Sequence, residues 1–138
     1  MRLTIEERAA NGARWLDENF PGWEKRINIK TLNLENGEAC ICGQVFKRKA
    51  RNWGIKQYGD STMSYGYDYA SETLFAEANS WISGMVPKGI TGWYRARKVS
   101  AVLGFSLPGN LSSKASWQKL QDAWVKLLEE RVNVKVPA

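Results

Sequence analysis

The chain contains no histidine, only two cysteines and four prolines in 138 residues. Zinc sites are commonly built from four cysteine and histidine ligands, so this composition predicts no metal centre. Histidine is also the commonest general base near neutral pH. Two cysteines cannot form the dense disulfide framework of a small secreted domain. The composition therefore argues against a metal site, a disulfide scaffold and the most common form of acid–base catalysis.

Long apolar runs and nucleotide-binding glycine motifs are missing as well. No stretch of eighteen apolar residues occurs, and residues 1–20 lack the apolar centre and cleavage site of a secretory signal. The chain has no Gly-X-Ser-X-Gly sequence and no phosphate-binding loop. We therefore predict a cytoplasmic, non-enzymatic protein with no membrane segment, no cofactor and no small-molecule ligand. A cryptic enzyme stays open as a further alternative.

Both cysteines lie in the sequence Cys40-Ile41-Cys42-Gly43. The well-understood redox motif has two residues between its cysteines and lies at a helix start. Residues two apart on a helix point about 200° away from each other, so they cannot share an ion. We interpret the pair as incidental thiols at the start of a helix, with one cysteine packed inward. Gly43 then allows a neighbouring element to approach closely.

The periodicity of apolar residues predicts one mainly α domain over residues 1–138, with about four helices. Thr4 is suited to cap a first helix, and Pro21-Gly22 to stop it. Residues 42–53 have helical spacing, with Gly54 in the position of a left-handed C-terminal residue. The seven tryptophans are expected to form much of the core.

Other segments are less clearly patterned, and an α+β fold with a small β-ribbon or extended element stays open. The tyrosines at positions 65, 67 and 69 would share one face if that piece were extended. Further helices are expected over roughly 70–84 and after Ser112 or Ser113. Residues 91–104 suit a helix closed by Gly104, but the first residues of this segment would also suit a strand. The tail at 132–138 is expected to fray or to pair as an edge strand.

The net charge of +6 is concentrated in two regions of the chain. Residues 40–70 hold five basic and two acidic side chains, and residues 88–119 hold six basic and none acidic. Cations neutralise phosphates, and aromatic faces can stack on unpaired bases. The candidate nucleic-acid residues combine both types; they are Lys47, Arg48, Lys49, Arg51, Trp53, Arg95, Arg97 and Lys98. A DNA- or RNA-binding function through these blocks is the alternative hypothesis, and an ordinary solvated face is the simpler interpretation.

A tyrosine-rich segment over residues 58–69 supports the leading hypothesis, which is a protein partner. Tyrosine and tryptophan are enriched at interface hot spots because they bury a large area and keep a polar end. The candidate contact residues are Tyr58, Met63, Tyr65, Tyr67 and Tyr69. The alternative stays open that two or three of these tyrosines pack back onto the domain.

Several short motifs also resemble those of small accessory proteins encoded by actinobacterial phages and prophages. The motifs are Trp15-Leu16-Asp17, Pro21-Gly22-Trp23, Arg26-Ile27, Leu32-Asn33-Leu34, Cys40-Ile41-Cys42-Gly43-Gln44 and Gly104-Phe105. The chain departs from the family pattern at Asn28 and Asn33, where aspartate is typical, and at Cys42, where an aliphatic residue is usual. The resemblance implies an accessory phage-type protein that acts in a bacterial host cytoplasm. It carries over no catalytic residue.

Overall fold

The computed structural model describes residues 2–60 and 65–135, the last four by their backbone alone. The described residues are mainly helical and include no strand. The principal helices are α1 (Ile5–Asn19), α2 (Ile41–Val45), α3 (Lys47–Tyr58), α4 (Gly66–Ala70), α5 (Gly92–Val102) and α6 (Lys114–Lys135). Short 3-10 turns connect them: η1 (Trp23–Arg26), η2 (Ile29–Thr31), η5 (Ser80–Met85) and η6 (Gly109–Leu111). A π-helical turn, η4 (Ser71–Phe75), continues directly from α4.

The two longest helices begin where the sequence predicts. Thr4 Oγ1 accepts a hydrogen bond from the Glu7 backbone N–H at 3.0 Å, and the Glu7 carboxylate accepts from the Thr4 N–H at 2.9 Å. This capping box satisfies two N–H groups that would otherwise have no partner. At the start of α6, Ser113 Oγ accepts from the Ser116 N–H at 3.1 Å. The expected caps at Thr4 and Ser113 are thus confirmed.

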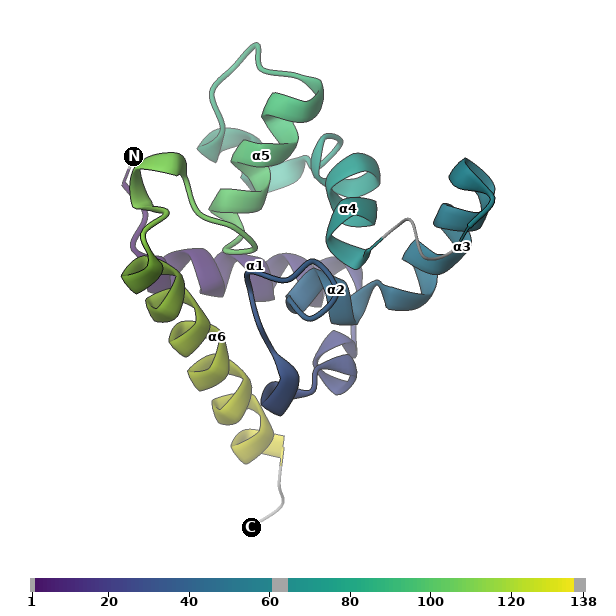
Figure 1. Cartoon of the computed structure of the whole chain (residues 1–138). Helices are drawn as coiled ribbons and strands as arrows, with labels where there is room; N and C mark the ends of the chain where they lie inside the picture. Colours follow the sequence, from purple (N-terminus) through teal and green to yellow (C-terminus); the bar gives the residue numbers. More distant parts are fainter. Residues whose placement is uncertain (1, 61–64, 136–138) are drawn as a thin grey trace.

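Helix α1 crosses the middle of the molecule and packs against both α6 and α5 (Figure 1). The core between them is built from stacked aromatic rings. Phe105 stacks on Phe75 and on Trp124, with centroid separations of 5.5 and 5.7 Å. Trp124 is fully buried, and its Nε1–H donates to the Gly104 carbonyl at 2.7 Å. A buried indole N–H needs such a partner, so this bond fixes α6 against the end of α5.

The tryptophans divide between the core and the surface. Trp15, Trp23 and Trp124 are buried, whereas Trp93 is 61% exposed. The remaining three are half-buried. The expectation that tryptophan forms much of the core is correct for Trp15, Trp23 and Trp124. Phenylalanine supplies much of the rest of the core.

Four sequence predictions of secondary structure are wrong. The helix expected over roughly 70–84 is instead the π-helical turn η4 and, after a break, the 3-10 turn η5. The proposed ribbon at residues 65–69 is helix α4, so its tyrosines point in different directions and do not share a face. The helix at 42–53 is two helices, and α3 ends at Gly59, which has φ of 72°, rather than at Gly54. The expected tail beyond Arg131 continues as helix to Lys135. Residues 136–138 lie outside the described part of the chain.

Candidate functional site: a cationic hollow beside α3

Helix α3 carries an unusual concentration of positive charge. Its five exposed cations, with no acidic residue among them, are Lys47, Arg48, Lys49, Arg51 and Lys56. Three of them occupy the first turn, where the helix dipole favours negative charge. Each exposed cation at a helix N-terminus costs roughly 0.3–1 kcal/mol at low salt. The arrangement is therefore unfavourable for the isolated helix and creates a positive field around it.

Small residues attach α3 to the body of the protein. Ala50 and Gly54 are the buried residues of the helix, and α3 packs along this side against α4. Half-buried Trp53 adds edge-on ring contacts to Tyr58 and Tyr69 at 5.8 and 6.1 Å. At the start of the helix, Lys49 Nζ lies 4.9 Å from the centre of the Phe20 ring. In Figure 1 the far end of α3 projects from the molecule. Lys56 lies toward this projecting end, and the other four cations lie in the first half of the helix.

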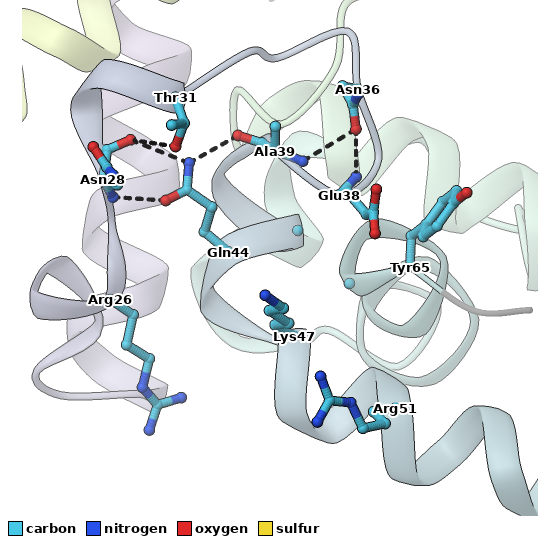
Figure 2. Close-up of a pocket in the computed structure, with 12 residues that line it drawn as sticks. Arg26, Asn28, Thr31, Asn36, Glu38, Ala39, Gln44, Lys47, Arg51 and Tyr65 are labelled. Carbon is cyan, nitrogen blue, oxygen red and sulfur yellow. Dashed lines mark hydrogen bonds between the residues drawn. The ribbon is translucent and has the colours of Figure 1, made fainter. Parts of the chain in front are cut away.

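A hollow of about 680 Å³ adjoins α3, and three cations and one carboxylate line it. Lys47 and Arg51 lie four residues apart, so they occupy the same side of the helix. Figure 2 shows them on one side of the hollow and Arg26, from η1, on the other. Among the described residues Lys47 and Arg51 make no ion pair. Glu38 is the single acidic residue of the lining, so the hollow carries a net positive charge.

The remaining wall of the hollow is held by its own hydrogen bonds. Gln44 Oε1 accepts from the Asn28 N–H at 2.6 Å, and Gln44 Nε2 donates to the Ala39 carbonyl at 2.9 Å (Figure 2). Asn36 Oδ1 accepts from the Glu38 N–H at 2.8 Å. These amide side chains are occupied in building the wall. Arg26 Nη1 likewise donates to the Val45 carbonyl at 3.1 Å. Lys47, Arg51 and the exposed Tyr65 are therefore the groups left to meet a ligand, and the chemistry they offer is anion binding beside an aromatic ring.

Two glycines permit the helix crossing that supports this wall. A Cβ atom at Gly43 would lie 2.4 Å from the Glu38 carbonyl carbon and oxygen, and one at Gly66 would lie 2.3 Å from the Cys42 carbonyl oxygen. No real side chain fits at such distances. The prediction that Gly43 allows a close approach is confirmed, and its partners are the backbone before α2 and the start of α4.

The two cysteines are part of the core and not of the hollow. Cys40 Sγ accepts a hydrogen bond from the Gly43 N–H at 3.2 Å, and Cys42 is fully buried. Burial raises the pKa of Cys40 to about 11 and raises the pKa of Cys42 as well. Both thiols are therefore protonated at neutral pH, as expected for packed and unreactive cysteines. The described residues contain no group of three or more His, Cys, Asp or Glu placed to hold a metal ion.

The tyrosines predicted to form a protein-binding surface do not act as one set. Tyr58 and Tyr65 are 53% and 45% exposed. The Tyr67 hydroxyl lies 3.0 Å from Ser100 Oγ, and the Tyr69 ring packs against Phe46 and Trp53. Met63 lies outside the described residues. The open possibility that some tyrosines pack back onto the domain is thus correct for Tyr67 and Tyr69.

The second basic block, which consists of Arg95, Arg97 and Lys98, is only partly available to a partner. The Arg95 guanidinium is half-buried and donates to the carbonyls of Ala76 and Ala78, where it ties α5 to the chain after η4. This corrects its assignment as a phosphate contact. Arg97 and Lys98 are exposed, with Arg97 4.8 Å from the centre of the Trp93 ring. Trp53 is half-buried against α3 and α4 residues, so it is a packing residue rather than an open stacking surface.

The two basic blocks also lie on different elements. Helix α3 packs on α4, η4 packs on α5, and α4 stands between α3 and α5 in Figure 1. The first block lines the hollow beside α3, and the second lines a separate hollow. Arg26 is the cation that sequence reasoning missed, because nothing in the sequence between residues 26 and 47 indicates that η1 packs on α2.

Comparison with protein-family models, with curated proteins and with solved structures finds no match to this chain. No helix of the described residues is long and apolar enough to cross a bilayer. The site is therefore assigned from its geometry alone.

Proposed function

We propose that this protein binds nucleic acid through α3 and the cationic hollow beside it. The observation that carries the proposal is the presence of five exposed cations and no acid on α3, two of them lining a hollow that Arg26 also lines. Phosphate groups would neutralise these cations and release condensed counterions, which is the main source of sequence-independent affinity. A polyanion would also relieve the unfavourable clustering of positive charge in the first turn of α3.

The shape of the site favours backbone contacts over base reading. Lys47 and Arg51 point into the hollow, while Arg48 and Lys56 lie on sides of α3 turned away from α4 by the helical period. Cations on several sides of one helix suit a strand that wraps around it. Exposed Tyr65 lies at the hollow and can stack on an unpaired base. We therefore expect single-stranded DNA or RNA to bind more tightly than duplex.

We propose binding alone, with no chemical step. The biological setting that we propose is the one that the phage-type resemblance implies. The hypothesis of a protein partner at the tyrosine segment remains a prediction, now restricted to Tyr58 and Tyr65 among the described tyrosines. For a phage-type protein, host or phage nucleic acid would be the natural ligand.

Fluorescence anisotropy with labelled 20-nucleotide single strands and duplexes tests the proposal. We expect micromolar or tighter binding at low salt and a loss of roughly tenfold or more in the Lys47→Gln/Arg51→Gln variant, because two phosphate contacts are removed. The matched control is Lys114→Gln/Lys119→Gln, which removes the same charge from exposed positions on α6. Absence of binding at low salt, or an equal loss in both variants, would overturn the proposal.

A further inference from the structure

A second hollow, of about 670 Å³, lies beside α5 and is independent of the site on α3. Its walls come from the loop after η5, the loop after α5 and the start of the chain. Six apolar residues of the wall are Leu3, Met85, Val86, Pro87, Leu107 and Pro108. Aliphatic walls of this kind accept aliphatic or aromatic groups, since ligand pockets are mostly apolar with a few placed polar groups.

The polar groups of this second hollow are positively charged. Arg8, Arg97 and Lys98 line it, and none of the described Asp or Glu residues does. Arg8 is only 8% exposed: its Nη1 donates to the Ala101 carbonyl at 2.7 Å, and its buried Nε has no acceptor among the described residues. Burial lowers the pKa of this guanidinium, because desolvation penalises its charged form. The described cations of this hollow are therefore suited to pair with a negatively charged group of a ligand.

Exposed Tyr94 lines the same hollow, and exposed Trp93 precedes it in the chain. Trp93 and Tyr94 are 61% and 66% exposed, and their rings meet edge-on at 5.1 Å. Arg97 already lies over the Trp93 ring. Trp, Tyr and Arg are the residues most enriched at hot spots of protein interfaces. Two large aromatic side chains exposed side by side at a helix start favour a surface that a partner covers.

We propose that the hollow beside α5 is a docking site for an acidic peptide segment of a partner protein, one that alternates carboxylates with large apolar side chains. The apolar side chains would enter between Val86 and Leu107, and the carboxylates would pair with Arg97, Lys98 and the edge of Arg8. An acidic peptide fits better than nucleic acid, because the walls are aliphatic and Arg97 already covers one face of Trp93. The proposal names a protein partner, but at residues different from the tyrosine segment, and it stands whether or not α3 binds nucleic acid.

Selection of a random dodecapeptide display library on the full-length protein tests this site. We expect enriched peptides that combine Asp or Glu with Leu, Phe or Trp. Synthetic copies of them should bind with micromolar affinity, measured by anisotropy. The Arg97→Glu/Lys98→Glu variant should lose at least tenfold, and Tyr94→Ala should weaken binding several-fold through lost aromatic contact. All three positions are exposed, so the fold is expected to persist; circular dichroism checks this.

A charge-reversed control on α6, Lys114→Glu/Lys119→Glu, should bind the peptides as wild type does. Enrichment without acidic residues, or equal binding to both charge-reversed variants, would overturn the proposal. Competition with an oligonucleotide is a further test. If an oligonucleotide that still binds the Lys47→Gln/Arg51→Gln variant displaces the peptides, the proposal is overturned and α5 is assigned to nucleic acid instead.

Discussion

At the scale of single residues, the structure depends on a few positions where only one side chain works. Gly43 and Gly66 let the backbones of α2 and α4 meet, and Cys40 caps α2 with its sulfur. These residues lie directly behind the cationic hollow. Their roles are structural, and they explain why the distinctive Cys40–Gln44 segment carries no chemistry of its own.

Replacement of Gly43 by alanine should destabilise the protein by roughly 1–3 kcal/mol, because the added methyl group must displace backbone. The matched control is Gly109→Ala, since a Cβ atom at Gly109 would contact nothing within 4 Å. Urea denaturation measures both. Equal stability of the two variants would show that the contact between Gly43 and the backbone at Glu38 is looser than described.

The two thiols should react slowly. With the pKa of Cys40 near 11, its thiolate is scarce at pH 8, and alkylation of the native protein should be less than about a hundredth as fast as that of free cysteine. A folded-state pKa above the unfolded value of 9.0 also means that the unfolded state loses its proton first. The contribution of Cys40 to stability should therefore be fully present below about pH 9 and be lost between pH 9 and 11. Rapid labelling of one thiol at neutral pH would contradict the buried placement.

At the scale of elements, α3 combines a dense cationic pattern with poor helix-end chemistry. Its first turn has cations where acidic residues are favourable, and Phe46 provides no side-chain cap. A helix selected for stability alone would not have this arrangement. We therefore expect the free energy of unfolding and the affinity for nucleic acid to change in opposite directions when the residues of this turn are altered.

The Arg48→Glu variant should raise the free energy of unfolding by roughly 0.5–1 kcal/mol, since the new carboxylate faces the positive end of the helix dipole. The melting temperature should rise by about 2–4 °C. The same variant should bind single strands more weakly. Lys56→Glu, in the last turn of α3, is the internal control, because an identical charge change there should lower stability. A calorimetric scan in which both variants shift in the same direction would refute this explanation.

Sequence reasoning was most successful where the signal is local. Helices α1 and α6 were predicted from their caps and apolar periodicity, both of which are properties of neighbouring residues. Residues 65–85 were mispredicted, because α4 begins where Gly66 packs on the Cys42 carbonyl, a contact that no local pattern reports. The hollow was anticipated only in part: Lys47 and Arg51 share a basic block, whereas Arg26 joins them through tertiary packing.

At the scale of the whole molecule, two cationic hollows of similar size lie on different elements and differ in chemistry. The one beside α3 is polar and has Tyr65 at its side, and the one beside α5 has aliphatic walls and an aromatic edge. Helix α1 packs against α6 and α5, and the stacked rings of Phe75, Phe105 and Trp124 fill the core between these elements. Such an arrangement suits a small adaptor that brings an acidic protein segment to a nucleic acid.

The salt dependence of nucleic-acid binding is the most direct test of the central role of α3. For single strands, the logarithm of affinity should fall with the logarithm of salt concentration with a slope near −3, as expected for about four phosphate contacts. The Lys47→Gln/Arg51→Gln variant should lower the magnitude of that slope by about 1.4, at roughly 0.7 per contact. An unchanged slope in this variant, together with a reduced slope in Lys114→Gln/Lys119→Gln, would contradict the account.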